Sequence, residues 1–264
     1  MELKIKNKIA LVTGSTAGIG FAIAKALANE GAKVFVNGRT TDRVNLAVAT
    51  LIKETGNQDI KGIVADFSDK NQIRQLTDQL PEVDILINNV GIFEPKAFEN
   101  ITDEDWMKFY EVNVLSGIRL SRAYFNQMIH KNWGRIIFIS SESGVQTPKE
   151  MIHYGVTKTA QIAVARGLAE LTKGTNVTVN TVLPGPTFSE GAGTFIKDLA
   201  AENGKTIGEI EKDFFQTMRP TSILQRFIDP DEIASLVAYL SSDLSIATNG
   251  AAVRADGGVI KSAF

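Results

Sequence analysis

Tyr154 and Lys158 lie four residues apart in the run 139–158, ISSESGVQTPKEMIHYGVTK, in which three serines precede them. Residues four apart share a helix face, so the ammonium group would lie near the phenol. At about 4 Å and an effective dielectric near 20, it would favour the phenolate by roughly 4 kcal/mol. That would lower the tyrosine pKa from about 10 by roughly two to three units, before desolvation of the lysine is counted. Such a phenol could exchange a proton with an oxygen whose carbon gains or loses hydride.

A tyrosine and lysine at this spacing also arise by chance on many amphipathic helices. Position strengthens the interpretation, because the pair begins a helical pattern that follows the apolar run 135–141. Ligands of parallel sheets bind at the carboxyl ends of strands. A serine hydroxyl at that strand end could donate a hydrogen bond to a developing oxyanion. The helix continues with an apolar stripe made of Val156, Ala160, Ala163, Val164, Gly167 and Leu171.

A glycine-rich turn, TGSTAGIG at residues 13–20, follows the first apolar run and leads into a second helical pattern. Glycines let the backbone turn tightly and approach a ligand. The helix that follows offers unpaired N–H groups and the positive end of its dipole to a pyrophosphate. A plain glycine turn is the alternative, but the strand before and the helix after favour dinucleotide binding.

The elements that must position these residues follow from seven short apolar runs separated by helical patterns. Near-continuous apolar character predicts strands buried on both faces, as in a parallel sheet. The alternation predicts an α/β fold, a single Rossmann-type, doubly wound parallel sheet flanked by helices and formed by one domain over residues 1–264. The runs are 8–14, 33–38, 60–66, 83–89, 135–141, 176–185 and 250–258.

Composition excludes several other classes of protein. The chain of 264 residues has no Cys, two His and a net charge of -2. Disulfides and thiolate metal sites are therefore excluded, and we expect no metal site. Without a basic surplus we expect no nucleic-acid partner. The N-terminus does not resemble a signal peptide, and no apolar run approaches a membrane span, so we expect a cytoplasmic protein with no membrane contact.

Motifs along the whole chain resemble those of the short-chain dehydrogenase/reductase superfamily. They are TGSTAGIG, NNVG at 88–91, Asn113, ISS at 139–141, YGVTK at 154–158, PGPTFS at 184–189 and RADGG at 254–258. Val90 replaces the usual alanine and would tighten the wall of the cofactor groove. The resemblance implies an oxidoreductase that transfers hydride between a nicotinamide and a carbonyl or secondary alcohol substrate.

The resemblance also assigns catalytic roles. It selects Ser141 among the serines as the oxyanion donor, makes Tyr154 the general acid/base and places Lys158 on the nicotinamide ribose. For Asn113 it implies a bound water that links Lys158 to solvent; a structural hydrogen bond to a neighbouring strand is the plainer interpretation. We expect Glu142 to be an exposed loop carboxylate, with contact to a polar or cationic substrate group as the alternative. We expect His153 to lie at the surface or at a helix start, with a position facing the substrate as the alternative.

The predicted cofactor-binding residues combine the glycine turn, the ends of the strands and the catalytic helix. In the family, the residue that matches Asp66 lies near the adenine amino group. The alternative role for Asp66 is to cap the helix that begins around Asp69. The whole set is Gly14, Ser15, Thr16, Gly18, Ile19, Gly20, Arg39, Thr40, Asp66, Phe67, Asn89, Val90, Gly91, Tyr154, Lys158, Pro184, Gly185, Thr187 and Ser189.

The loop after the second strand predicts which dinucleotide binds. A carboxylate there would bind the ribose 2′-hydroxyl of NAD and repel a 2′-phosphate. This chain has Asn37, Gly38, Arg39 and Thr40 instead. A guanidinium is well suited to a phosphate. We therefore expect NADP(H) to be preferred, with NAD(H) as the alternative, unless Arg39 is simply an exposed loop arginine.

Residues 188–229 form the longest stretch without a predicted strand, and a structureless loop of that length is uncommon. Helical character at 200–202 and 207–218 predicts a lid over the substrate, with an apolar underside. The residues expected there are Phe188, Phe195, Ile196, Phe214, Phe215 and Met218.

The pattern leaves the small-molecule carbonyl or alcohol substrate unidentified. A 3-oxoacyl-[acyl-carrier-protein] reductase and a catalytically silent NADP-binding regulator remain alternatives. The resemblance further implies a homotetramer, with a dimer as the alternative and with helices 103–130 and 154–172 at one interface.

Overall fold

Seven parallel strands form a single sheet in the order β3-β2-β1-β4-β5-β6-β7. The structure is a computed structural model that describes residues 2–189, 193, 196–197, 200–202 and 204–263. Every predicted strand is present, so the α/β doubly wound sheet is confirmed. The strands are β1 (Ile9–Val12), β2 (Lys33–Gly38), β3 (Ile60–Val64), β4 (Ile85–Asn88), β5 (Gly134–Ile139), β6 (Val177–Pro184) and β7 (Ala252–Ala255).

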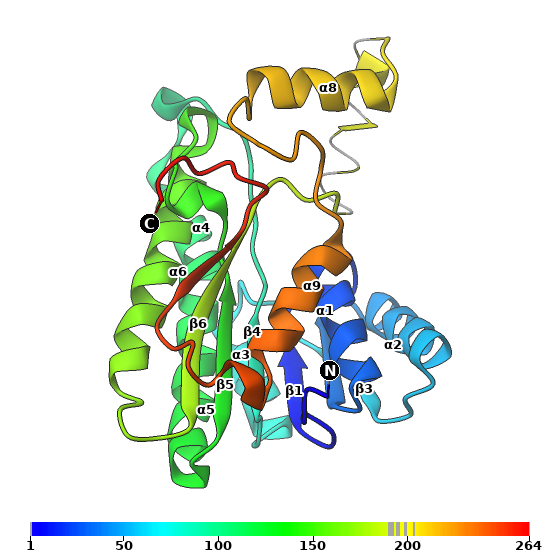
Figure 1. Cartoon of the computed structure of the whole chain (residues 1–264), viewed down its shortest axis with the longest axis vertical. Coiled ribbons are helices and arrows are strands. Elements are labelled where there is room, and N and C mark those ends of the chain that lie inside the picture. The colour runs from blue at the N-terminus through cyan, green and yellow to red at the C-terminus, as the bar shows by residue number, and fades with distance from the viewer. Residues whose placement is uncertain (1, 190–192, 194–195, 198–199, 203, 264) are drawn as a thin grey trace.

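Helices cover both faces of the sheet (Figure 1). One apolar core joins the sheet to α1 (Gly18–Asn29), α2 (Thr41–Thr55) and α9 (Pro230–Leu240). The other joins it to α3 (Lys70–Gln79), α5 (Ser116–Lys131) and α6 (Ile152–Glu170). All residues of β5 and β6 are buried. Because full burial of one such aliphatic side chain contributes about 1.5–3 kcal/mol, these central strands hold the layers together.

The order of the strands reverses between β1 and β4. The chain runs outward from β1 through β2 to β3 and then returns to pair β4 on the other side of β1. Loops leaving β1 and β4 therefore diverge at the carboxyl edge of the sheet. Such a switch point opens the crevice in which ligands of doubly wound folds bind.

The helix expected to begin after Thr102 is interrupted by a wider turn. It consists of α4 (Asp103–Tyr110), a π-helical turn at Glu111–Leu115, and α5. Thr102 and Asp105 form a reciprocal capping box at its start. Asn113 lies within the π turn. Single π turns of this kind often occur at functional sites.

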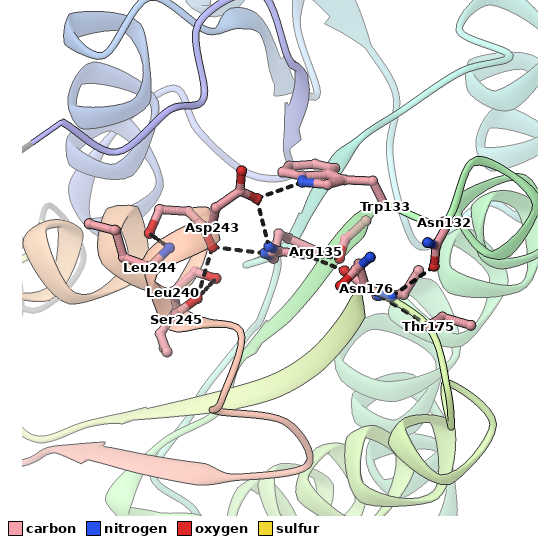
Figure 2. Close-up of polar contacts among 12 residues, drawn as sticks. Asn132, Trp133, Arg135, Thr175, Asn176, Leu240, Asp243, Leu244 and Ser245 are labelled. Atoms are coloured by element: carbon pink, nitrogen blue, oxygen red, sulfur yellow. Dashed lines mark hydrogen bonds and ion pairs between the residues drawn. The ribbon is translucent and has the colours of Figure 1, made fainter.

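A buried arginine ties the amino end of β5 to the segment after α9 (Figure 2). The Arg135 side chain is 1% exposed, and its Nη2 lies 3.1 Å from Asp243 Oδ1. Its Nε donates to the Ser242 carbonyl at 3.0 Å, and Trp133 Nε1 donates to Asp243 Oδ1 at 2.7 Å. A buried guanidinium must have such partners. This network lies at the edge of the sheet opposite the carboxyl ends.

The segment after β6 carries α8 (Ile207–Thr217), which lies beyond the carboxyl ends of the strands (Figure 1). Residues 200–202 are also helical, so the two predicted helical stretches are present. A small apolar core inside the segment contains Ile196, Ala200, Ile210, Phe215 and Phe227. Phe195, also expected in this underside, lies outside the described residues. Across the described residues, the helices are all too short or too polar to cross a membrane.

Candidate active site

A cleft of about 1100 Å³ runs along the carboxyl edge of the sheet, from the glycine turn to the segment after β6. Nearly all of the predicted site residues line it, and two do not. Ser15 and Asn113 are buried behind its wall. The predicted residues that line it are Gly14, Thr16, Gly18, Ile19, Gly20, Arg39, Thr40, Asp66, Phe67, Asn89, Val90, Gly91, Ser141, Tyr154, Lys158, Pro184, Gly185, Thr187 and Ser189.

The glycine turn is shaped for close approach of a phosphate. Gly14 and Gly18 have positive φ angles of 60° and 58°, a region that favours glycine. A Cβ on Gly20 would lie 2.4 Å from the Gly14 carbonyl oxygen, so the helix could not pack against the turn with a larger residue. The N-cap of α1, Ala17, gives no side-chain hydrogen bond, and the first turn has no acidic residue. The N–H groups of this helix end therefore suit a pyrophosphate.

Ser15 supports the turn from behind. Its hydroxyl donates to the Val12 carbonyl at 2.7 Å and accepts from the Asn37 N–H at 2.9 Å. The Asn37 side chain in turn accepts from the Gly14 N–H at 3.0 Å. Asn89 donates to the carbonyls of Thr13 and Gly14 at 2.9 and 3.1 Å. Polar side chains at three strand ends thus fix the turn that would hold the phosphates.

At the far end of the cleft, two exposed arginines, Arg39 and Arg43, line the wall beside Asp66. The pKa of Asp66 is lowered, mainly because the Ser68 N–H donates to it and also because Arg39 lies nearby. Asp69, not Asp66, caps α3, since its carboxylate accepts from the Asn71 N–H at 2.8 Å. Asp66 is therefore left to face the cleft, and Arg43 is a lining residue that the sequence reasoning missed.

Tyr154 and Lys158 lie on the same side of α6. The Lys158 ammonium is 5.5 Å from the centre of the Tyr154 ring. It donates to the Ile139 carbonyl at 2.9 Å and to Gln161 Oε1 at 3.2 Å. Burial lowers the pKa of Lys158 to about 8, and the negative charge of Glu142 partly opposes that shift. The lysine is therefore fixed by two acceptors at the carboxyl end of β5.

Gln161 connects this lysine to the π turn. Its amide Nε2 donates to the Asn113 carbonyl at 2.6 Å while its oxygen accepts from Lys158. The Asn113 side chain accepts from the Ile92 N–H at 2.8 Å and donates to the Ile92 carbonyl at 3.0 Å. Asn113 therefore makes the structural contact of the plainer interpretation, to the loop after β4. In the sequence, Gln161 follows Lys158 by three residues, and that spacing could have indicated the contact between their side chains.

The pKa of Tyr154 is raised in this structure, which contradicts the expected depression. Desolvation of the phenol is the main cause, and the charge of Glu142 acts in the same direction. A hydrogen bond with Ser141 and the charge of Arg219 lower the pKa but do not outweigh those effects. The spacing of tyrosine and lysine predicted correctly that both side chains lie on one side of the helix, but it carried no information on burial or on the nearby carboxylate.

Glu142 is not the exposed loop residue expected from the sequence. It is 5% exposed, and its Oε1 pairs with Arg219 Nε at 3.1 Å. The Ser141 hydroxyl donates to its other carboxylate oxygen. Arg219, 9% exposed, follows α8 and also pairs with Glu150 at 2.9 Å. Glu142 and Arg219 are 77 residues apart in the chain, so no local pattern indicated the ion pair between them.

His153 lies at the start of α6 but is fully buried and does not line the cleft. Its ring packs 4.1 Å from the centre of Phe109 and 6.1 Å from that of Trp106. Within the described residues, neither ring nitrogen has a hydrogen-bond partner. Burial lowers the pKa of His153. The expectation of a surface position is therefore wrong, and the side chain does not face the substrate.

The turn after β6 closes the remaining side of the cleft. Thr187 Oγ1 donates to the Gly185 carbonyl at 2.9 Å, and the Ser189 N–H donates to the Thr187 carbonyl at 2.8 Å. A Cβ on Gly185 would lie 2.5 Å from the Asp256 carbonyl oxygen, within the RADGG motif. The two late motifs thus pack against each other at Gly185, which lines the cleft.

Known proteins that are similar to this chain in sequence or in structure include several oxidoreductases. Residues 8–199 match the family model described as short chain dehydrogenase. The uncharacterized oxidoreductase YvaG of Bacillus subtilis is 49% identical over 100% of both chains. The 3-oxoacyl-[acyl-carrier-protein] reductase FabG of Aquifex aeolicus is 32% identical over 98% of this chain and 100% of its own. The structure of L-sorbose reductase from Gluconobacter frateurii with NADPH and L-sorbose has a TM-score of 0.93 at 28% identity, covering 99% of this chain and 100% of that one.

Proposed function

We propose a function from one premise: this chain belongs to the short-chain dehydrogenase/reductase family, whose members are NAD(P)-dependent oxidoreductases. The proposed reaction is hydride transfer between NADP(H) and a carbonyl or secondary alcohol substrate. The observation that carries it is the convergence of Ser141, Tyr154 and Lys158 on one cleft that also contains the glycine turn. Side chains that can transfer a proton therefore line the same cleft as the proposed dinucleotide-binding turn.

Tyr154 is assigned the transfer of the proton. Because its pKa is raised above 10, the phenol is protonated at neutral pH and can donate to the oxygen of a carbonyl as that oxygen gains charge. Ser141 would stabilise the same oxygen by a hydrogen bond. The Lys158 ammonium, 5.5 Å from the tyrosine ring, stabilises the phenolate left behind. Bound nicotinamide would supply the hydride in reduction and accept it in oxidation.

The preference for NADP(H) rests on Arg39 and Arg43 at the end of the cleft that lies beyond the second strand. Guanidinium groups bind phosphate by paired, charge-assisted hydrogen bonds. The solved structure of L-sorbose reductase contains NADPH, which agrees with this assignment for a relative. We expect kcat/KM for NADPH to exceed that for NADH by at least about tenfold, and Arg39→Ala to remove most of that preference.

The cofactor assay needs one control. Lys33→Ala changes an exposed cation at the other end of β2 and should leave the ratio unchanged. A ratio below one in the natural protein would refute the NADP(H) assignment, and an unchanged ratio in Arg39→Ala would refute the role of Arg39.

Reduction of a 3-oxoacyl thioester is a second candidate. It is supported by relatives of that activity at 32% identity and by the apolar side chains of Phe214, Met218 and Phe227 in the cleft. A catalytically silent regulator is the remaining alternative. It would bind NADPH but would oxidise it with no carbonyl compound in a broad panel, so turnover separates it from either enzyme.

The proposal also includes a homotetramer, residence in the cytoplasm and closure of residues 188–229 over the substrate as a lid. Three exposed apolar side chains support an interface on the helices expected at 103–130 and 154–172. These are Met107 on α4, and Val156 and Leu171 on or beside α6, exposed by 66%, 45% and 65%.

A further inference from the structure

Glu142 and Arg219 form a charged pair that lines the cleft, and Arg219 also pairs with Glu150 at 2.9 Å. The side chains of Glu142 and Arg219 are nearly buried, which is costly for charges unless they are paired and hydrogen-bonded. They lie next to the catalytic serine, which is where the reacting end of a substrate must bind. The cleft that contains this pair also has apolar lining residues, which include Phe93, Val112, Met151, Phe214, Met218 and Phe227.

The carboxylate of Glu142 also engages the catalytic serine. The Ser141 hydroxyl donates to Glu142, and its oxygen accepts from the Ser143 N–H at 3.1 Å. A serine hydroxyl has one hydrogen. While that hydrogen is directed at Glu142, it is not available to a carbonyl oxygen. Something must compete for the carboxylate before Ser141 can serve the oxyanion.

We propose that the natural substrate is a carbonyl compound with a hydroxyl on the adjacent carbon, and that this hydroxyl binds between Glu142 and Arg219. The inference rests on the proposed function and names its substrate class. The substrate hydroxyl donates to the Glu142 carboxylate and accepts from the Arg219 guanidinium. It thereby competes with Ser141 for Glu142, and the serine hydrogen turns to the carbonyl oxygen.

The reaction then balances as an ordinary carbonyl reduction. Hydride from NADPH forms the new C–H bond, the C=O π bond breaks, and Tyr154 donates its proton to the oxygen. The phenolate regains a proton from solvent, and the product is a vicinal diol. In reverse, a vicinal diol is oxidised to the hydroxy carbonyl compound with reduction of NADP.

Other substrate classes satisfy this pair less well. A plain ketone has no hydroxyl with which to donate a hydrogen bond to the Glu142 carboxylate. A carboxylate beside the reacting carbonyl would meet the like charge of Glu142. A hydroxyl supplies one donor and an acceptor, which matches a carboxylate and a guanidinium together.

The test compares matched substrates in the natural protein. We expect kcat/KM with NADPH to be at least about tenfold higher for 3-hydroxybutan-2-one than for butan-2-one, since these differ by one hydroxyl. Equal values, with measurable turnover of both, would overturn this inference and leave the proposed function standing. Absence of NADPH oxidation with every carbonyl compound tried would overturn both.

Variants then assign the preference to the pair. Glu142→Gln should reduce the ratio between the two substrates to within about threefold, because the neutral amide binds a hydroxyl more weakly. Arg219→Lys, which keeps the positive charge, provides a second variant if the first does not fold. The control is Glu170→Gln at an exposed carboxylate on α6, which should keep the natural ratio. An undiminished ratio in a folded Glu142→Gln protein that binds NADPH normally would contradict the assignment.

Discussion

The catalytic chemistry depends on how single side chains are desolvated. Tyr154 and Lys158 lie as their spacing predicts, yet burial raises the pKa of the phenol and lowers that of the ammonium. Both shifts favour the neutral forms, as burial in a poorly solvated site must. A protonated phenol near a cation is suited to donating its proton to an alkoxide, which is far more basic. In the reductive direction the phenol is therefore in the protonated form that proton donation requires at neutral pH.

His153 gives a prediction about stability. Because burial holds its pKa below 6.5 in the folded state, the unfolded chain binds the proton more readily, and the free energy of unfolding must fall as pH drops below 6.5. His153→Phe, which keeps an aromatic ring against Phe109, should reduce that loss by up to about 1.4 kcal/mol per pH unit. Urea unfolding at several pH values between about 7.5 and 5 measures it.

The matched control for this experiment is the other histidine. His130 is exposed on α5, so His130→Gln should retain the pH dependence of the natural protein. If His153→Phe and the natural protein lose stability in parallel as pH falls, the buried histidine is not the source of the effect.

Local patterns selected residues that mostly line one cleft, but they did not indicate how several of these residues are oriented. The glycine turn, the strand ends and the pair on α6 depend on spacing within one or two elements, which a sequence displays directly. Ser15 was expected at the cofactor but braces the scaffold, and Asn113 makes structural hydrogen bonds, which were one of the two roles expected for it. Arg219 reaches Glu142 from 77 residues away, and only the packing of the segment after β6 brings them together.

At the scale of elements, Gln161 joins α6 to the π turn between α4 and α5. The resemblance implied that Asn113 holds a water linking Lys158 to solvent, and the structure adds a side-chain amide that joins Lys158 to the Asn113 carbonyl. An amide holds the lysine in place but is a poor substitute for water in passing a proton. We therefore regard Gln161 as a positioning residue for Lys158.

Two variants test this role by moving the pH dependence in opposite directions. Gln161→Met removes an acceptor from the Lys158 ammonium, so its pKa should fall below about 8 and the alkaline loss of kcat should begin at lower pH. Gln161→Glu keeps an acceptor and adds negative charge, so that loss should begin at higher pH. Profiles of kcat from pH 6 to 10 that coincide in all three proteins would exclude the role.

For the whole molecule, the two ends of the sheet serve separate purposes. The carboxyl ends, where the strand order reverses, hold the glycine turn and the catalytic set. The amino end of β5 holds the buried Arg135 network, which joins distant parts of the chain and takes no part in the cleft (Figure 2). The sequence predicted the sheet, because apolar runs of strand length recur regularly. It could not predict the network, whose partners are about a hundred residues apart.

The proposed function requires Tyr154 to be the proton donor in the NADPH-dependent reduction of a carbonyl compound. The decisive measurement is kcat for that reduction, followed as NADPH oxidation, in Tyr154→Phe and in the natural protein, with NADPH affinity determined in parallel. We expect kcat to fall by about 10²- to 10⁴-fold while the affinity for NADPH stays within about threefold. A Tyr154→Phe protein that retains the natural kcat would contradict the account.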